Sequence, residues 1–309
     1  DDPKAEAYAK EKAQAAQFGA PAKARGLEGV RVVIDAGHGG RDTGTLHDDV
    51  WESTYVYDVA CRLRALLLER TRADVVLITK SAAKGFAVQE LDVLPNTKDR
   101  VLLTDPPYAL DDPVLGVNLR WYLANSILKR PGPDKKKIPP EKTVFLSIHA
   151  DSLHPSVRGA MVYIPGERFL RDRFGKRGGV YASYKEYREQ PTVSFNGRER
   201  IVSEGVSETL AERLLGAMRK ADLPVHLFSP VRTHVVRGGG EWVPAVLRYN
   251  RIPNRVLLEI ANLANVDDRA LVKTRKFRHE MAESIVTGLL DFFGDAEKES
   301  PATRTTASP

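Results

Sequence analysis

Short runs of apolar and β-branched residues alternate along this chain with longer stretches in which apolar residues recur every three or four positions. The short runs are typical of strands buried in a parallel sheet. The longer stretches are typical of helices with one apolar face. We expect strands at residues 30–35, 74–79, 143–148, 159–164 and 255–260, and helices at residues 52–70, 115–128, 203–220 and 276–293.

The order of these elements indicates the fold class. Strands that alternate with helices predict an α/β fold, here a single domain over residues 29–294 with a mostly parallel, twisted sheet flanked by helices on both faces. Residues 1–28 are rich in Ala, Lys and Glu, and we expect a polar tether or surface helix there. Residues 295–309 offer little apolar surface to bury, which predicts a disordered tail.

Two segments interrupt the alternation. Residues 81–116 and 165–202 are both longer than the connections that compact domains normally use. We therefore interpret them as insertions with a structure or function of their own.

Composition narrows the possible functions only slightly. Hydrophobic residues make up 42% of the chain and charged residues 28%, as in ordinary globular proteins. No apolar run is long enough for a membrane span, and the polar start predicts no signal peptide, although a mature form would have lost one. The net charge of +6 favours an anionic partner, but the charges are dispersed and no motif indicates nucleic-acid binding. A single cysteine, Cys61, excludes an internal disulfide and favours a buried core residue over a nucleophile.

Candidate metal ligands stand where the predicted strands end. His38 follows the first strand, His149 follows the third, Glu259 lies near the end of the last, and Glu52 opens the first helix. Open parallel sheets place their functional sites at the carboxyl ends of their strands. We therefore expect these four side chains to lie close together.

The chemistry of this group fits metal-assisted hydrolysis. Two imidazoles and one carboxylate are a known ligand set of catalytic zinc, and a glutamate that does not bind the metal can transfer protons. Gly37, Gly39 and Gly40 allow the backbone to turn sharply beside His38. Asp35 and Asp151 are candidates for orienting the imidazoles, although aspartates at strand ends are as often loop hydrogen-bond partners.

The pattern of residues alone does not decide the site, because no compact HExxH motif is present. The remaining histidines have no comparable context, and we interpret them as surface or local packing residues. Those with some chance of lining a cleft are His47 and His154. The others are His226, His234 and His279.

A resemblance to a known family makes the interpretation more specific. The chain contains VVIDAGHGGRDTG, a glutamate that opens a helix, FLSIHADS followed by GAMVYI, and VLLEIANLAN, in that order. Together these blocks resemble the zinc-dependent N-acetylmuramoyl-L-alanine amidases of the amidase 3 family, over about residues 30–293. The resemblance implies one zinc ion, peptidoglycan as the substrate, and cleavage between N-acetylmuramic acid and L-alanine of the stem peptide. It also implies action in the bacterial cell envelope, periplasmic or secreted, and we take a monomer as the default.

Site residues follow from the resemblance position by position. The family's zinc ligands fall on His38, Glu52 and His149, and its catalytic glutamate, the general base and acid, falls on Glu259. Three further positions match and are expected to contact substrate: Arg120, Asn125 and Arg248. A structural salt bridge explains Arg120 equally well.

The chain also departs from the family pattern. Glu-Lys-Asp has become Glu52-Ser53-Thr54, and Gly-Phe in the late motif has become Ala261-Asn262. Residues 165–202 stand where division-associated members carry a helix that plugs the zinc cleft. On that reading Glu167 or Glu186 would cap the metal and an activator protein would be needed. An ordinary surface excursion explains the segment as well.

Two other functions stay open. One is a zinc peptidase or deacylase that acts on a different amide. The other is a catalytically degenerate wall-binding or regulatory protein, which the presence of all four charged residues disfavours.

Overall fold

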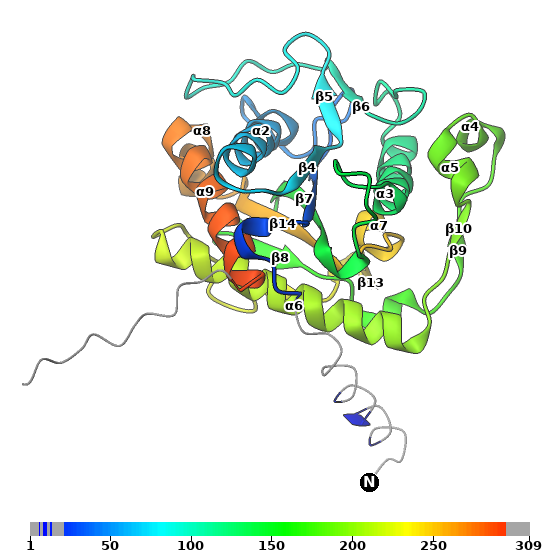
Figure 1. Cartoon of the computed structure of the whole chain (residues 1–309). Coiled ribbons are helices and arrows are strands. Elements are labelled where there is room, and N and C mark those ends of the chain that lie inside the picture. Colours follow the sequence, from blue (N-terminus) through cyan, green and yellow to red (C-terminus); the bar gives the residue numbers. More distant parts are fainter. Residues whose placement is uncertain (1–5, 7–8, 11–12, 14–21, 295–309) are drawn as a thin grey trace, which may run out of the picture.

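The computed structural model describes residues 6, 9, 10, 13 and 22–294. Its centre is a six-stranded sheet with the order β11-β8-β14-β7-β1-β4 (Figure 1). The four strands from β14 to β4 run parallel, β8 is antiparallel to β14, and β11 is parallel to β8. The mostly parallel sheet predicted from the sequence is therefore confirmed. Its strands are β1 (Arg31–Ala36), β4 (Asp74–Leu77), β7 (Thr143–Asp151), β8 (Met161–Tyr163), β11 (Val231–Arg232) and β14 (Asn254–Asn262).

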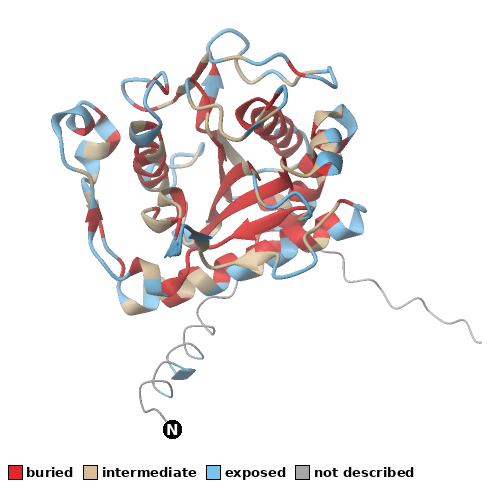
Figure 2. Ribbon diagram, turned by 180° about the vertical axis from the view of Figure 1, so that it is seen from behind, coloured by how far each residue is buried: buried red, intermediate tan, exposed pale blue. Residues whose placement is uncertain are grey.

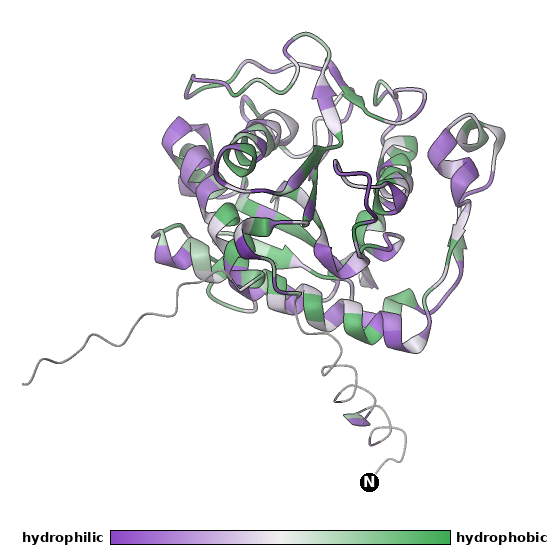
Figure 3. Cartoon of the chain, in the orientation of Figure 1, coloured by the Kyte–Doolittle hydropathy of each residue, from purple (hydrophilic) through white to green (hydrophobic). Residues whose placement is uncertain are grey.

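Helices cover both faces of the sheet, as predicted. Val32 and Ile34 of β1 point into one apolar core, and Val33 between them points into the other. Both faces of the strands are buried (Figure 2), and the helices turn their apolar sides toward the sheet (Figure 3). The first core is covered by α2 (Glu52–Arg70), α6 (Gly197–Lys220) and α9 (Arg275–Phe292), and the second by α3 (Pro113–Lys129) and α7 (Ala245–Arg248).

Several boundaries differ from the sequence-based expectation. The run 74–79 is not one strand, because β4 ends at Leu77 and the chain then leaves the sheet as the separate strand β5 (Thr79–Ser81). Helix α6 begins at Gly197 rather than residue 203, because Asn196 and Glu199 form a capping box. The helix α8 (Val266–Lys273) was not predicted. The remaining short elements are β2 (Leu46–His47), β3 (Val50–Trp51), β12 (Val235–Arg237), β13 (Gly240–Trp242) and the 3₁₀ turns η1 (Arg25–Leu27), η2 (Pro140–Lys142) and η3 (Glu167–Leu170).

The first insertion covers one side of α2. It leaves through β5 (Thr79–Ser81) and returns through β6 (Arg100–Leu102), which pairs antiparallel with β5. The chain between β5 and β6 is hydrogen-bonded to helices α2 and α9. Arg278 of α9 donates to the carbonyls of Leu91 and Asp92, and the amide of Leu94 donates to the hydroxyl of Tyr55. The insertion is thus a fixed cover.

The second insertion forms an arm beside α3 (Figure 1). The arm packs on α3 through Tyr122, whose hydroxyl donates to the carbonyl of Pro191 over 2.9 Å. Its tip is held by Glu186, whose carboxylate accepts from the amide of Asp105. The elements of the arm are β9 (Phe174–Gly175), α4 (Gly179–Ala182), α5 (Lys185–Glu189) and β10 (Thr192–Val193).

The structure describes only part of the two chain ends for which a tether and a tail were expected. The predicted tail 295–309 and most of the predicted tether lie outside the described residues. Residues 22–28, by contrast, join the domain, because Leu27 is fully buried and the amide of Ala24 donates to the carbonyl of Phe293. These residues therefore pack against the domain and do not form a free tether. Among the described residues, no helix is long and apolar enough to cross a membrane.

A buried ionic cluster joins α2, α9 and the first insertion. The carboxylate of Asp58 accepts from Arg62 Nε at 2.8 Å, from Arg278 Nε at 2.7 Å and from the amide of Gln89 at 2.8 Å. Asp58, Arg62 and Arg278 are each at most 4% exposed. One carboxylate therefore neutralises part of the charge of two buried guanidinium groups.

We expect Asp58→Ala to lower the free energy of unfolding by about 3–5 kcal/mol, because it leaves two guanidinium groups buried without a counter-charge. Urea denaturation followed by circular dichroism measures the change. Glu283→Ala is the control, since its exposed pair with Arg70 contributes at most about 1 kcal/mol. A loss for Asp58→Ala no larger than that of the control would show that the cluster does not support the fold.

Candidate active site

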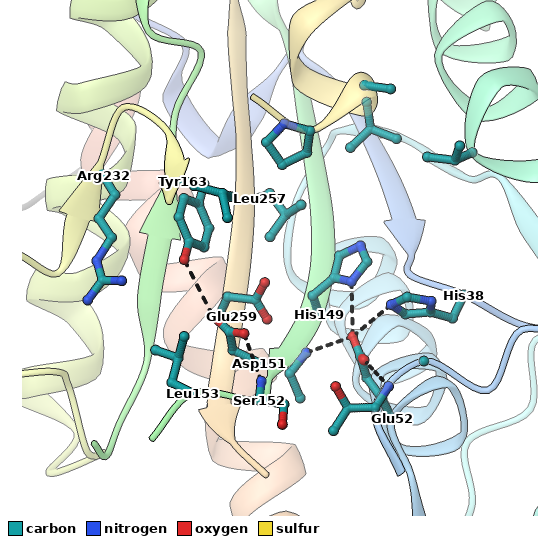
Figure 4. Close-up of a pocket in the computed structure, with 18 of the residues that line it drawn as sticks. His38, Glu52, His149, Asp151, Ser152, Leu153, Tyr163, Arg232, Leu257 and Glu259 are labelled. Atoms are coloured by element: carbon teal, nitrogen blue, oxygen red, sulfur yellow. Dashed lines mark hydrogen bonds and ion pairs between the residues drawn. The ribbon is translucent and has the colours of Figure 1, made fainter. Parts of the chain in front are cut away.

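The three predicted metal ligands converge on one point at the carboxyl edge of the sheet (Figure 4). Their ligand atoms all lie within 4.8 Å of one another. Glu52 Oε1 stands 3.2 Å from His38 Nε2 and 2.9 Å from His149 Nδ1. Two imidazole nitrogens and one carboxylate oxygen thus face a common centre.

The loop after β1 gives His38 its position. His38 has a left-handed backbone conformation, with φ of 61°. The buried guanidinium of Arg120 holds that turn, because it donates to the carbonyls of Ala36 and His38 and pairs with the carboxylate of Asp35. Asp35 also accepts from the hydroxyl of Ser147 on β7. The expected role of Asp35 was wrong, since this carboxylate orients Arg120 and not an imidazole.

Two glycines let the backbone approach the ligands closely. A Cβ atom at Gly37 would lie 2.3–2.6 Å from ring atoms of His149. Gly44 has φ of 67°, and a Cβ atom there would lie 2.5 Å from Glu52 Oε2 and 2.7 Å from His38 Cδ2. Any side chain at either position would displace a ligand.

Asp42 orients His38, and the sequence analysis did not identify it. Its Oδ2 lies 2.8 Å from His38 Nδ1, and its Oδ1 accepts from the amide of Gly44. Holding Nδ1 in this way leaves Nε2 directed at the centre. The available signal was the position of this aspartate four residues after His38 in HGGRD.

Glu52 is fixed by the backbone around it. Its Oε2 accepts from the amide of Thr45 at 2.7 Å, and its Oε1 accepts from the amide of Ala150 at 3.1 Å. Burial alone would raise the pKa of Glu52, but the neighbouring His38 and His149 outweigh burial and lower it. The carboxylate is therefore ionised at neutral pH.

The same charges hold a proton on His38. Burial by itself lowers the pKa of His38, but the charge of Glu52 and the hydrogen bond with Asp42 raise it to about 10. A metal ion at this centre competes with that proton, so binding of a cation strengthens as pH rises.

Glu259 stands beside this centre on the neighbouring strand. It is the register partner of His149 in the parallel β7–β14 ladder. The side chain is 8% exposed, and its Oε2 is buried without a hydrogen-bond partner among the described residues. Burial, followed by the charges of Asp151 and Glu52, raises the pKa of Glu259 well above its usual value. A carboxyl group held in this way can take up and release a proton at a higher pH than an exposed one.

These groups lie in a long cleft of about 1490 Å³. Its walls include His47, His154, His226 and His234. The chain after α6 folds back over the sheet edge and brings His226 and His234 to the cleft wall, where His234 also packs on Phe169 and pairs with Glu241. Beyond Glu259, Tyr163 and Arg232 line the cleft (Figure 4).

Asp151 lies in the cleft without contacting an imidazole. Its Oδ1 accepts from the amide of Ser152 at 2.7 Å, and its Oδ2 lies 3.4 Å from the hydroxyl of Tyr163. Burial raises its pKa. The expected orienting role is replaced by an electrostatic one, since its charge acts on Glu259.

The predicted substrate contacts have structural partners instead. Arg120 is 4% exposed and occupied with Asp35 and the His38 loop. Asn125 is 2% exposed and ties α3 to the carbonyl of Tyr249 and the amide of Arg251. The contacts of both residues support a positioning role. Arg120 also lines the cleft, and the expected contact of the two residues with substrate stays a prediction.

Arg248 lies outside the cleft lining. Its Nε donates to the carbonyl of Phe169, and its guanidinium stacks on the ring of Phe174 at 4.6 Å. It therefore anchors the start of the second insertion, and the expected substrate contact is not supported.

The second insertion does not close the cleft in this structure. Glu167 pairs with Arg200 at 2.8 Å and Arg171 at 3.1 Å, and Glu186 lies near Arg130 on the far side of α3. No described residue between 165 and 202 lines the cleft. Neither glutamate caps the proposed ligands, and the need for an activator, which depended on occlusion, gains no support.

Comparisons with known proteins agree with this fold. An uncharacterized cell wall amidase of Bacillus anthracis is 26% identical over 272 residues, which is 86% of this chain and 36% of that protein. The chain thus spans about a third of the length of this relative. The amidase Ami1 of Mycobacterium smegmatis shares the fold with a TM-score of 0.54 and 20% identity, covering 87% of this chain and 99% of the other. The N-acetylmuramoyl-L-alanine amidase of Clostridium difficile 630 has a TM-score of 0.50 and 17% identity, covering 87% and 98%.

The family itself is decided by a match over most of the chain. The sequence model described as N-acetylmuramoyl-L-alanine amidase matches residues 32–291. This range includes the sheet, apart from Arg31 at the start of β1, and all four residues at its carboxyl edge. The chain belongs to the amidase 3 family of N-acetylmuramoyl-L-alanine amidases.

Proposed function

We propose that this protein hydrolyses the amide bond between N-acetylmuramic acid and the L-alanine of the peptidoglycan stem peptide, with one zinc ion as cofactor. The observation that carries the proposal is the meeting of His38, Glu52 and His149 at one centre, with Glu259 beside it. Family membership supplies the substrate class. We place its action in the bacterial cell envelope, where peptidoglycan lies, and take a monomer as the default.

The donor set fits zinc. Two imidazole nitrogens and one carboxylate oxygen are a recurrent catalytic zinc set, and three protein ligands leave a coordination position for water or substrate. When bound there, zinc lowers the pKa of water and polarises the carbonyl of the scissile amide.

Glu259 carries the proton transfers. In its ionised form it removes a proton from the attacking water, and in its protonated form it donates a proton to the departing amine of L-alanine. Because the side chain is buried, bulk water does not solvate its ionised form. Its Oε2 has no hydrogen-bond partner among the described residues, so one acceptor is free for the reaction. Glu52, with both oxygens occupied by backbone amides and the histidines, is unsuited to this task.

The buried, unpartnered Glu259 also weighs against a degenerate binding protein. A carboxyl group in that state costs stability, and a protein that only binds the wall has no use for it. A peptidase or deacylase with the same centre is distinguished by its products.

Digestion of purified peptidoglycan with zinc-loaded protein, with and without a chelator, tests the proposal by mass spectrometry. We expect chelator-sensitive release of stem peptides that begin with a free L-alanine amine, together with unsubstituted glycan. Cleavage inside the peptide would indicate a peptidase instead, and binding without any release would indicate a wall-binding protein.

We expect Glu259→Gln to lower the rate of peptide release by about 10²–10⁴-fold, because the amide cannot transfer protons. Zinc content, measured by atomic emission, stays at the wild-type value. Glu69→Gln, an exposed carboxyl group on α2, serves as the control and retains full activity. Full activity in zinc-loaded Glu259→Gln would rule out the proposed role.

We expect Asp42→Ala to weaken zinc binding by about 10–100-fold, because Nδ1 of His38 loses the partner that orients the ring. Competition with a zinc-binding dye measures the affinity directly, without an activity assay. Asp48→Ala, an exposed aspartate in the same loop region, is the control. Equal affinities of wild type and Asp42→Ala would show that the ring is held by other contacts.

The pH dependence follows from the charge of Asp151. That charge raises the pKa of Glu259, so Asp151→Asn lowers it. Because the base must be ionised, we expect the acidic limb of the kcat/KM profile to move to lower pH. Asp134→Asn, which lies outside the cleft, leaves the limb in place. An acidic limb that does not move in Asp151→Asn would mean that another group controls it.

A further inference from the structure

A second cavity lies between α2 and the first insertion, and it shares no lining residue with the catalytic cleft. Its volume is about 220 Å³. Apolar side chains line part of it: Ala83, Ala87, Leu94 and Pro95. The polar part of the lining includes two carboxylates and two cations: Asp58, Asp99, Lys84 and Arg100.

The two carboxylates of this cavity already have partners. Asp58 accepts from two guanidinium groups and a backbone amide, as described above. Asp99 accepts from the hydroxyls of Ser81 at 2.5 Å and Thr97 at 2.7 Å, and from the amide of Ala83. Lys84 is likewise engaged, since its Nζ donates to Gln89 Oε1.

Arg100 has no such partner. Its side chain is 4% exposed, and its Nε and Nη1 are buried without an acceptor among the described residues. The guanidinium instead stacks on the ring of Tyr57, 4.6 Å from its centroid. Burial lowers its pKa to about 10, so the group is charged at neutral pH. A buried guanidinium without a hydrogen-bonded anion is strongly unfavourable, which indicates that a partner belongs there.

The cations in and beside the cavity outnumber its two carboxylates. Asp58 is shared between Arg62 and Arg278, which lie beside the cavity but outside its lining, so two cations there share one carboxylate. Asp99 is sequestered by hydroxyl and amide donors on the insertion. An added anion would therefore meet a local excess of positive charge.

We propose that this cavity is a binding site for a small monocarboxylate, whose carboxylate pairs with Arg100 and whose short apolar body lies against Ala83, Ala87, Leu94 and Pro95. A guanidinium pairs with a carboxylate through charge-assisted hydrogen bonds. The volume is below the 300–1,000 Å³ typical of sites for drug-sized ligands, so the ligand is small. Arg100 is the one cation of this lining without a hydrogen-bonded acceptor among the described residues, and it suits one negative charge better than a phosphate dianion.

The site lies directly behind the metal-binding loop. Arg100 packs against Gly39, where a Cβ atom would stand 3.4 Å from Arg100 Cβ and 3.5 Å from its Cδ. Gly39 is the neighbour of His38. A ligand held by Arg100 is thus one side chain away from the loop that carries a proposed zinc ligand, although it is outside the catalytic cleft.

Thermal unfolding of the zinc-loaded protein tests the proposal. The probes are sodium butyrate for a free short acid and N-acetyl-D-alanine for a peptide carboxyl terminus. Butyramide serves as the uncharged analogue, and sodium chloride matches ionic strength. We expect saturating carboxylate to raise the Tm by about 2–4 °C. Whichever of the two acids gives the larger rise identifies the source, and butyramide leaves the Tm unchanged.

Variants locate the binding. Arg100→Met keeps the apolar stem and removes the charge, and we expect it to abolish the response to carboxylate. Lys84→Met, the paired and exposed cation of the same cavity, keeps the response. If Arg100→Met still responds, the carboxylate binds elsewhere, for example at the zinc ion, and the proposal is wrong.

A titration of the wild-type protein keeps the test decisive if Arg100→Met does not fold. Isothermal titration calorimetry with butyrate and butyramide is expected to detect only the carboxylate, and Arg100→Lys is expected to bind it at least 10-fold more weakly. Equal binding of the acid and the amide, or no binding of either acid, would overturn the proposal.

Discussion

The parallel register of β1, β7 and β14 is the constraint on which the site depends. Ala36 is the partner of Ile148, and His149 is the partner of Glu259, so the end of β1 lies level with His149 and Glu259, while β7 and β14 continue beyond it. Side chains of register partners point to the same face of a sheet. A shift of one residue in β14 would turn Glu259 to the opposite face, away from His149. The hydrogen bonds of the ladder thereby fix the position of the proton-transfer group relative to the proposed metal ligands.

Buried polar contacts connect the strands to the loop that carries His38 and so fix the position of that loop relative to the sheet. Asp35 accepts from Ser147 across the β1–β7 ladder and pairs with Arg120 of α3. Arg120 in turn holds the carbonyl of His38. Helix α3 therefore stabilises the position of His38, although it contributes no proposed metal ligand. Low exposure makes these contacts strong, because no water competes for the donors.

The two insertions differ in what they do to the domain. The arm of residues 165–202 packs on α3 and leaves the catalytic cleft open. The cover of residues 81–116 lies over α2, adjoins the loop of His38 through Arg100 and encloses a second cavity. Length alone did not distinguish them. They differ in their buried charges. The cover contains Arg100, a buried cation without a hydrogen-bonded acceptor in the described part of the chain, whereas the buried glutamates of the arm, Glu167 and Glu186, lie beside arginines.

The sequence determined the fold class and the convergence of His38, Glu52, His149 and Glu259. The periodicity of apolar residues reports which faces are buried, and the ends of parallel strands must meet at one edge. The sequence predicted the ends of helices less well where side-chain hydrogen bonds set them. The capping box of Asn196, which starts α6, is an example.

Only the tertiary structure decided the roles of residues whose partners are far away in the chain. Arg120 and Asp35 are 85 positions apart, and Asn125 and Tyr249 are 124 apart, so the structural use of Arg120 and Asn125 could not be read from local pattern. His226 and His234 entered the cleft because a loop folds back over the sheet edge. Periodicity records how deeply a side chain is buried, but a polar side chain takes its role from the atoms it faces, and those are set by packing between distant segments.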